Sequence, residues 1–353
     1  MTGKRMLLCL LAAAIFLMTA LTGCGSKIDA DAVGATLDGE EISMGFMNFM
    51  ARYQQMQYDS YFVSYYGTEY WSQTVSEEEA DEDGNVTPAK TLEDSVKESV
   101  AENVELLYLL EDHMADYNVE ITDEEMSSIE ETAKQFMEDN SKEAISQLGA
   151  TEEYVKEMLR LTTIQKKMED AVYAASTATV TDEEAAQRTY SYIQVSTTTT
   201  TDSDGNSVDL TDDEKTALEA DMQTYVTAAK ADFDGVAAEK GYTVSTQSYG
   251  SDNTLDEELV AAADALKEGE VSDLITTDSY YYVIRLDKEY DEEATAEKKE
   301  SLLESKKQEE YEALCDSYKE AATFELNEEQ WAKVTFSPLF SVASDDSEDS
   351  DSE

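Results

Sequence analysis

The chain has 353 residues, with 25 Lys and Arg against 80 Asp and Glu, which gives a formal net charge of −55. This excess of acid excludes a nucleic-acid-binding surface, because neutralising phosphates requires basic side chains. An apolar fraction of 41% with 21 tyrosines is too high for a disordered acidic chain, so the sequence predicts one large or two modest folded domains.

Residues 1–23 have the pattern of a lipoprotein signal peptide. Lys4 and Arg5 precede an apolar run from Met6 to Ala20, which is too short for a comfortable membrane span. A Leu-Thr-Gly stretch then precedes Cys24, whose thiol is the nucleophile that would take a diacylglyceryl group. The sequence therefore predicts a chain anchored by a lipid on Cys24 at the extracytoplasmic face of the cell membrane. An ordinary secretory signal with an incidental cysteine is the alternative.

The three cysteines have different predicted fates. Cys9 leaves with the signal peptide and Cys24 becomes a thioether, so Cys315 is the one free thiol of the mature chain. An intramolecular disulfide is thereby excluded, and the exported domains depend on their cores for stability. Because Cys315 lies beside a helical stripe of leucine and tyrosine, we expect it to be a packing residue.

A helix rich in methionine and aromatic residues is predicted after Ser43, which has the side chain of a helix N-cap. Between residues 44 and 66 the apolar side chains cover more than one helical face. This surplus favours a client-binding surface, because methionine and tyrosine adapt to varied apolar partners; the predicted contact residues are Met44, Met47, Met50, Tyr53 and Met56. Core packing against the helices that follow stays open as the alternative.

Further helices are predicted up to about residue 178. Residues 96–114 carry valine, leucine and methionine at helical spacing, and Thr122 and Thr151 have the context of N-caps. His113, the one histidine of the chain, lies on the flank of this apolar stripe. A lone imidazole without a second histidine or a nearby cysteine is predicted to be structural or exposed.

The pattern changes between residues 181 and 290. Strands are predicted near 190–195, 241–249 and 280–286, and helices over 213–240 and 255–266. This order of strand, helix, strand, helix and strand predicts a small α+β domain. One long charged helix follows over residues 292–324, and residues 337–353 are predicted to be a disordered acidic tail.

Several local motifs carry a resemblance to a known family. They are Leu37-Asp38-Gly39-Glu40-Glu41-Ile42-Ser43, Ile121-Thr122-Asp123-Glu124-Glu125, residues 148–153 (LGATEE), residues 262–273 (AADALKEGEVSD) and residues 281–286 (YYVIRL). In this order the motifs resemble the PrsA-like and SurA-like extracytoplasmic foldases. The resemblance covers nearly all of residues 33–325.

The resemblance implies an α+β fold of two parts. A mostly helical SurA-N-like chaperone domain would comprise residues 24–180 and be completed by a C-terminal helix within residues 292–336. A parvulin-like α+β domain would be inserted at residues 181–290. In this family the inserted domain is a prolyl isomerase. The resemblance therefore also implies an enzymatic activity and a pocket that carries it.

The residues of that pocket differ from the family pattern. Parvulins place two histidines at its floor and a phenylalanine against the proline ring. Tyr192 and Tyr282 stand at the two histidine positions, and the proline-gripping position falls near Leu259. A mechanism that needs an imidazole pair is excluded, so no catalytic residue is predicted. The two tyrosines are interpreted either as a degenerate peptide groove or as packed strand residues.

Candidate metal and cofactor sites are weak. Residues 81–85 (DEDGN) and 202–207 (DSDGNS) resemble the start of a calcium loop, but both lack the sixth-position glycine and the glutamate at position 12. Turns explain them more simply. Glycine-rich phosphate loops, nucleophile elbows and zinc-ligand spacings are absent from the sequence, so no metal and no cofactor are predicted.

The sequence thus favours a membrane-anchored extracytoplasmic chaperone or foldase that assists the folding of exported proteins. Its partners would be unfolded or nascent exported proteins, with the membrane contacted only through the lipid; a homodimer stays open. The parvulin-like domain is expected to be weak or inactive. An active peptidylprolyl isomerase with a rebuilt pocket is one alternative, and a lipoprotein specific to one binding or assembly partner is another.

Overall fold

The computed structural model describes residues 28–77, 79–80, 86–201 and 205–340. The predicted signal peptide, Cys24 and the acidic residues from 341 onward lie outside the described residues. The described chain divides into two compact units, one ending at Ser176 and resuming at Glu309, the other comprising Thr177–Gln308. The second boundary falls inside one helix, α10 (Glu292–Ala321).

A small sheet begins the first unit. Strands β1 (Val33–Leu37) and β2 (Glu40–Ser43) form an antiparallel hairpin whose turn residues, Asp38 and Gly39, have φ values of 50° and 89°. Strand β11 (Phe324–Leu326) pairs with β1 on the other side, which gives the order β11-β1-β2. Residues nearly 290 positions apart in sequence are therefore neighbours in this sheet.

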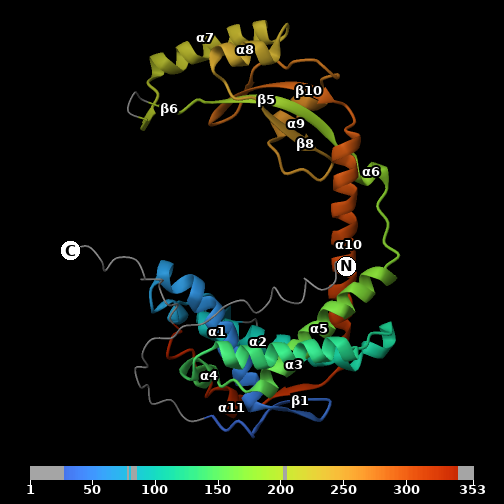
Figure 1. Cartoon of the computed structure of the whole chain (residues 1–353). Helices are drawn as coiled ribbons and strands as arrows, with labels where there is room; N and C mark the ends of the chain where they lie inside the picture. The colour runs from blue at the N-terminus through green and yellow to red at the C-terminus, as the bar shows by residue number, and fades with distance from the viewer. Residues whose placement is uncertain (1–27, 78, 81–85, 202–204, 341–353) are drawn as a thin grey trace, which may run out of the picture. The chain divides into compact units, whose positions relative to one another are not determined.

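Helices make up most of the first unit (Figure 1). They are α1 (Met44–Tyr66), α2 (Leu92–Asp112), α3 (Asp123–Asp139), α4 (Lys142–Leu148), α5 (Glu152–Ala175), the C-terminal part of α10 and the short α11 (Glu328–Trp331), with 3-10 turns η3 (Tyr70–Ser72) and η4 (Met114–Tyr117) and a short pair β3 (Glu79–Ala80) and β4 (Val86–Thr87). The predicted N-caps are confirmed: Ser43, Thr122 and Thr151 each accept a hydrogen bond from the backbone three residues on.

The core of the first unit forms where α1, α2, α5 and the sheet meet. Methionines and phenylalanines of α1 pack there with valines and leucines of α2 and α5. The core also includes Trp331, Val334, Phe336 and Phe340 near the C-terminus. The sequence prediction of a disordered tail from residue 337 is therefore wrong for residues 337–340, because Phe340 is only 3% exposed.

The second unit is built on an antiparallel sheet of order β8-β5-β10-β9. Its strands are β5 (Arg188–Ser196), β8 (Ser245–Tyr249), β9 (Ile275–Thr276) and β10 (Tyr280–Lys288). Helices α7 (Asp212–Ala229) and α8 (Phe233–Lys240) cover one face, and α9 (Glu257–Asp264) lies on the other (Figure 1). A short helix, α6 (Asp182–Ala185), and a hairpin of β6 (Thr199–Thr201) and β7 (Ser207–Asp209) complete the unit.

The sheet of the second unit has a core on each face. Ile193 and Val283 pack with Met222, Tyr225 and Phe233 beneath α7 and α8. The opposite face packs tyrosines and aliphatic residues against α9. The predicted α+β character of this part of the chain is thus confirmed. Among the described residues, no helix has the length and apolarity needed to cross a membrane.

Candidate functional site

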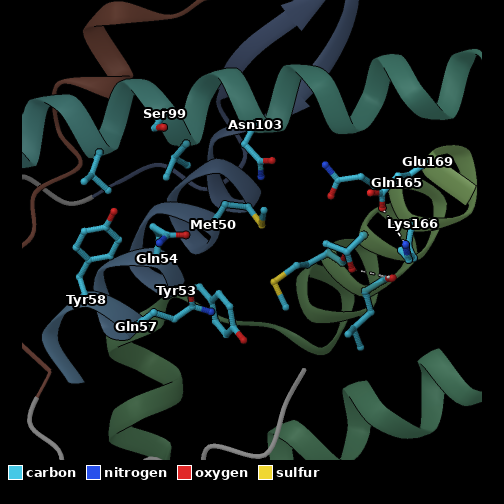
Figure 2. A pocket seen from close by; sticks show the side chains of 15 residues that line it. Met50, Tyr53, Gln54, Gln57, Tyr58, Ser99, Asn103, Gln165, Lys166 and Glu169 are labelled. Carbon is cyan, nitrogen blue, oxygen red and sulfur yellow. Dashed lines mark hydrogen bonds and ion pairs between the residues drawn. The ribbon is translucent and has the colours of Figure 1, made fainter. Parts of the chain in front are cut away.

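A cavity of about 600 Å³ opens in the first unit between α1, α2 and α5 (Figure 2). Its walls are Met50, Tyr53, Gln54, Gln57 and Tyr58 of α1; Val96, Ser99, Val100 and Asn103 of α2; and Met158, Leu159, Thr162, Gln165, Lys166 and Glu169 of α5. The α1 residues recur at spacings of three and four, so one face of that helix forms one wall. Residues from three helices converge on one space.

The cavity combines an apolar floor with an amide rim. Met50, Val100 and Met158 are at most 8% exposed and form the floor. Figure 2 shows the amide side chains of Gln54 and Asn103 directed toward the space. Apolar walls can accommodate client side chains of varied shape, because methionine changes conformation at little cost. Amide groups can donate to and accept from a polypeptide backbone.

The charges at the cavity wall are largely paired within it. The Lys166 ammonium lies 3.0 Å from a Glu169 carboxylate oxygen and 2.9 Å from that of Asp170. These hydrogen bonds raise the pKa of Lys166 above its ordinary value. Burial raises the pKa of Tyr53, so its hydroxyl stays neutral at physiological pH. The cavity therefore offers apolar surface and neutral hydrogen-bonding groups rather than an acid–base pair.

The structure separates the predicted client-binding residues into two groups. Met50 and Tyr53 line the cavity. Met44 and Met47 are fully buried in the core, and Met56 is 6% exposed, which corrects the prediction for these three. For Met44 and Met47 the physical reason is the hairpin of β1 and β2, which covers the first turns of α1; a Cβ added at Gly34 would lie 2.7 Å from the Met47 sulfur. Met56 belongs to the core cluster of the first unit.

The cavity residues on α2 and α5 were not predicted from the sequence. Asn103 and Gln165 lie beside the apolar stripes of their helices; Asn103 is exposed and Gln165 is partly buried. A polar amide beside each stripe was the available signal. It becomes meaningful only when α1 is placed opposite, since a single amphipathic helix does not show which partner it faces.

The predicted parvulin-like pocket lies on the α9 face of the second sheet. Leu259 and Tyr282 are buried, at 6% and 8% exposure, and Tyr192 is half-buried. They share one core cluster with Tyr190, Tyr249, Ile275, Ile284 and Leu286. Packed side chains therefore occupy the place where Tyr192, Leu259 and Tyr282 meet.

Two tyrosines of this cluster, Tyr190 and Tyr282, are poor proton-transfer groups. Burial raises the pKa of Tyr190 to about 12, with smaller contributions from Tyr192 and Tyr282. Burial likewise raises the pKa of Tyr282. A catalytic acid or base works best when its pKa lies near the operating pH, so these hydroxyls are unsuited to that role.

His113 belongs to the first unit and lies at the C-terminal end of α2, whereas this cluster belongs to the second unit. Its Nδ1 is 2.8 Å from a carboxylate oxygen of Asp116, and its ring stacks on Tyr318 with centroids 3.7 Å apart. These contacts agree with the structural role predicted for it. In the part of the chain that the structure describes, no group of three or more His, Cys, Asp or Glu side chains could hold a metal ion. Residues 81–85 and 202–204 of the two acidic loops lie outside that part.

Comparison with known proteins finds one family model and several similar foldases. The family model of the PPIC-type PPIase domain matches residues 199–292. The foldase protein PrsA of Staphylococcus aureus strain MRSA252 is 28% identical over 247 residues, which are 67% of this chain and 74% of that protein.

Solved structures of similar proteins also match. The foldase PrsA of Lactococcus lactis matches 87% of this chain and 98% of its own, at 16% identity and a TM-score of 0.35. The foldase protein PrsA of Streptococcus pneumoniae matches 65% and 87%, at 22% identity and a TM-score of 0.27. By these comparisons the chain is similar to PrsA foldases, and its residues 199–292 match the PPIC-type PPIase domain.

Proposed function

We propose that this chain is an extracytoplasmic foldase of the chaperone type, held at the membrane by a lipid on Cys24, and that it binds unfolded segments of exported proteins in the cavity between α1, α2 and α5. The cavity carries the proposal: its methionine floor suits varied apolar side chains and its amide rim suits a polypeptide backbone. The relatives named foldase support the same function.

The proposal assigns the two functions to different parts of the chain. Residues 24–180, completed by residues 292–336, form the client-binding domain, and the parvulin-like domain of residues 181–290 is an insertion in it. The acidic surface keeps the chaperone soluble and attracts basic segments of unfolded clients. The lipid places the cavity where exported chains emerge.

We further propose that the PPIC-type domain isomerises X–Pro bonds weakly or not at all. The chain has 1 histidine, and His113 lies in the other unit. Leu259 and Tyr282 belong to one buried cluster, and Tyr192 packs against it. The match of residues 199–292 to the PPIC-type family favours the second candidate function, an active isomerase with a rebuilt pocket.

A chaperone assay tests the first proposal. The protein without residues 1–24 should suppress aggregation of several unrelated unfolded proteins. Asn103→Trp fills the cavity mouth from α2 and should weaken suppression at least fivefold. Glu131→Trp, at an exposed position of α3, is the matched control and should leave suppression unchanged. Equal suppression by both variants contradicts the cavity as the client site, and suppression of one client alone favours a partner-specific lipoprotein.

An isomerisation assay tests the second proposal. The same protein is mixed with a proline peptide, whose uncatalysed isomerisation takes on the order of tens to hundreds of seconds. We expect the relaxation rate to stay at the spontaneous value. A rate that rises in proportion to protein concentration, and that falls in Tyr192→Ala, supports the active isomerase.

A further inference from the structure

The last described residues of the chain, Val334–Phe340, are held against α1 by side chains rather than by another strand. We name them the C-terminal segment. Arg52 donates from Nη1 to the carbonyl oxygen of Thr335 at 2.7 Å and from Nη2 to that of Pro338 at 3.0 Å. Gln55 Nε2 donates to the carbonyl oxygen of Phe336 at 3.0 Å.

Further side chains hold the same backbone. Gln147 of α4 donates from Nε2 to the carbonyl oxygens of Pro338 and Leu339, at 3.0 and 3.1 Å. Lys97 of α2 donates to that of Val334 at 2.8 Å. The N–H of Phe340 donates to Asp59 Oδ2 at 2.7 Å. Contacts of this kind recognise the main chain, so they do not depend on most of the side chains of the segment.

Two aromatic side chains anchor the C-terminal segment. Phe336 is 2% exposed and meets the Trp71 ring edge-on, with centroids 4.5 Å apart. Phe340 is 3% exposed and lies under the Arg52 guanidinium, 5.0 Å from the ring centroid. The side chains of Thr335 and Ser337, on either side of Phe336, are exposed. Recognition therefore combines backbone carbonyls with two aromatic rings four residues apart.

The groups that hold the segment are unusually polar for a protein core. Arg52 is 5% exposed, Asp59 2% and Gln55 0%. Burying a charge or an amide costs free energy unless the group is hydrogen-bonded. Apolar contacts alone would hold the C-terminal segment against α1 at a lower cost in free energy. These polar groups lie at positions 52, 55 and 59, and the cavity residues of α1 lie at 50, 53, 54, 57 and 58. At 100° per residue the two sets face opposite sides of the helix.

We propose that Arg52, Gln55, Asp59, Gln147 and Trp71 form a second peptide-binding site, and that the C-terminal segment occupies it as an internal competitor. The ligand is an extended polypeptide segment with two aromatic residues four positions apart. The proposal rests on the proposed chaperone function and names a class of client segment for it. A client segment of this kind displaces the C-terminal segment and takes over its hydrogen bonds.

Binding of a peptide in trans tests the proposal. The probe is a fluorescently labelled peptide with the sequence of residues 333–340 (KVTFSPLF). The protein without residues 1–24 is compared with its Phe336→Ala, Phe340→Ala double variant, in which the C-terminal segment binds its site less tightly. We expect the double variant to bind the probe at least tenfold more tightly than the unchanged protein. Thr335→Ala is the control: it changes an exposed side chain, and the backbone carbonyl of residue 335 still accepts from Arg52. This variant should bind the probe like the unchanged protein.

Hydrogen exchange gives a second measurement that needs no variant. An excess of probe should speed exchange at the amide of Phe340 in the unchanged protein, because displacement frees it from Asp59. A folded double variant that fails to bind the probe overturns the proposal. If the double variant does not fold, unchanged exchange at Phe340 under excess probe overturns it. Suppression of client aggregation without probe binding defeats this inference alone, whereas probe binding without suppression defeats the proposed function.

Discussion

Tyr192 and Tyr282 lie on the same face of the sheet in the second unit, with ring centroids 6.1 Å apart. They belong to neighbouring antiparallel strands, and Tyr192 is directly opposite Ile284. Leu259 of α9 packs in the same cluster. Histidines at positions 192 and 282 would place two imidazoles in a pocket, whereas the tyrosines present there pack their rings in the core. The stability of this unit should therefore depend on Tyr192 and Tyr282, the positions that the resemblance to parvulins would assign to catalysis.

Tyr282→Ala should lower the free energy of unfolding of the second unit by about 3–5 kcal/mol, since it removes a buried aromatic side chain. Tyr280 lies on the same strand but is 37% exposed. Tyr280→Ala is thus the control, with an expected loss below about 1 kcal/mol. Urea unfolding followed by circular dichroism measures both. Equal small losses would mean that the cluster is loosely packed and that the pocket can open.

Asp59→Asn should destabilise the first unit by about 1–3 kcal/mol. The carboxylate accepts from Tyr70 Oη at 2.6 Å, Trp71 Nε1 at 2.8 Å, Gln55 Nε2 at 2.9 Å and Phe340 N at 2.7 Å. An amide in its place turns one acceptor into a donor that faces other donors. Thermal unfolding measures the loss, with Glu131→Gln on exposed α3 as the control. An unchanged midpoint for Asp59→Asn would show that water relieves the conflict.

Local features of this fold were predictable from the sequence, and long-range ones were not. The N-caps at Ser43, Thr122 and Thr151 depend on three or four neighbouring residues, so their patterns sufficed. Contacts of Arg52 with Thr335 and Pro338 join residues more than 280 positions apart. No local sequence pattern marks that pairing. The acidic composition beyond residue 340 led to a predicted disordered tail that included residues 337–340.

The candidate site shows the same limit. Methionine and aromatic residues around α1 indicated apolar side chains on more than one face of the helix, but not which partner covers each face. The hairpin covers Met44 and Met47, and the cavity faces Met50 and Tyr53. Only the arrangement of α2 and α5 around α1 distinguishes these positions, because methionine and aromatic residues occupy both faces of α1.

The thiol of Cys315 should resist maleimide labelling in the folded protein without residues 1–24. It is 5% exposed and packs with Tyr311, Ile164 and Met168. Burial raises the pKa of the Cys315 thiol, so the reactive thiolate is scarce at neutral pH. Labelling should become fast only at urea concentrations that unfold the first unit. Fast labelling without urea would show that α10 separates locally from its neighbours.

Asp291 should make the free energy of unfolding of the second unit depend on pH in the acidic range. Its carboxylate accepts from Lys288 Nζ at 2.9 Å, from Thr189 Oγ1 at 2.7 Å and from backbone N–H groups at the start of α10. These hydrogen bonds, that of Lys288 first, lower the pKa of Asp291 from 3.8 to about 2. A lowered pKa in the folded state means that the unfolded state binds the proton more readily. The stabilisation is therefore complete above the ordinary pKa and is lost as the pH falls from about 4 to about 2.

Asp291→Ala removes this contribution and isolates it from the other carboxylates of the chain. At pH 5 the variant should be less stable than the unchanged protein by about 1–3 kcal/mol, because Thr189 and the backbone N–H groups lose their acceptor. The difference should shrink as the pH approaches 2, where the unchanged protein has lost the same contribution. Urea midpoints measured between pH 2 and pH 5 test this, with Glu292→Gln at the exposed first residue of α10 as the control. A difference that stays constant over this range would show that Asp291 acts through packing and not through its charge.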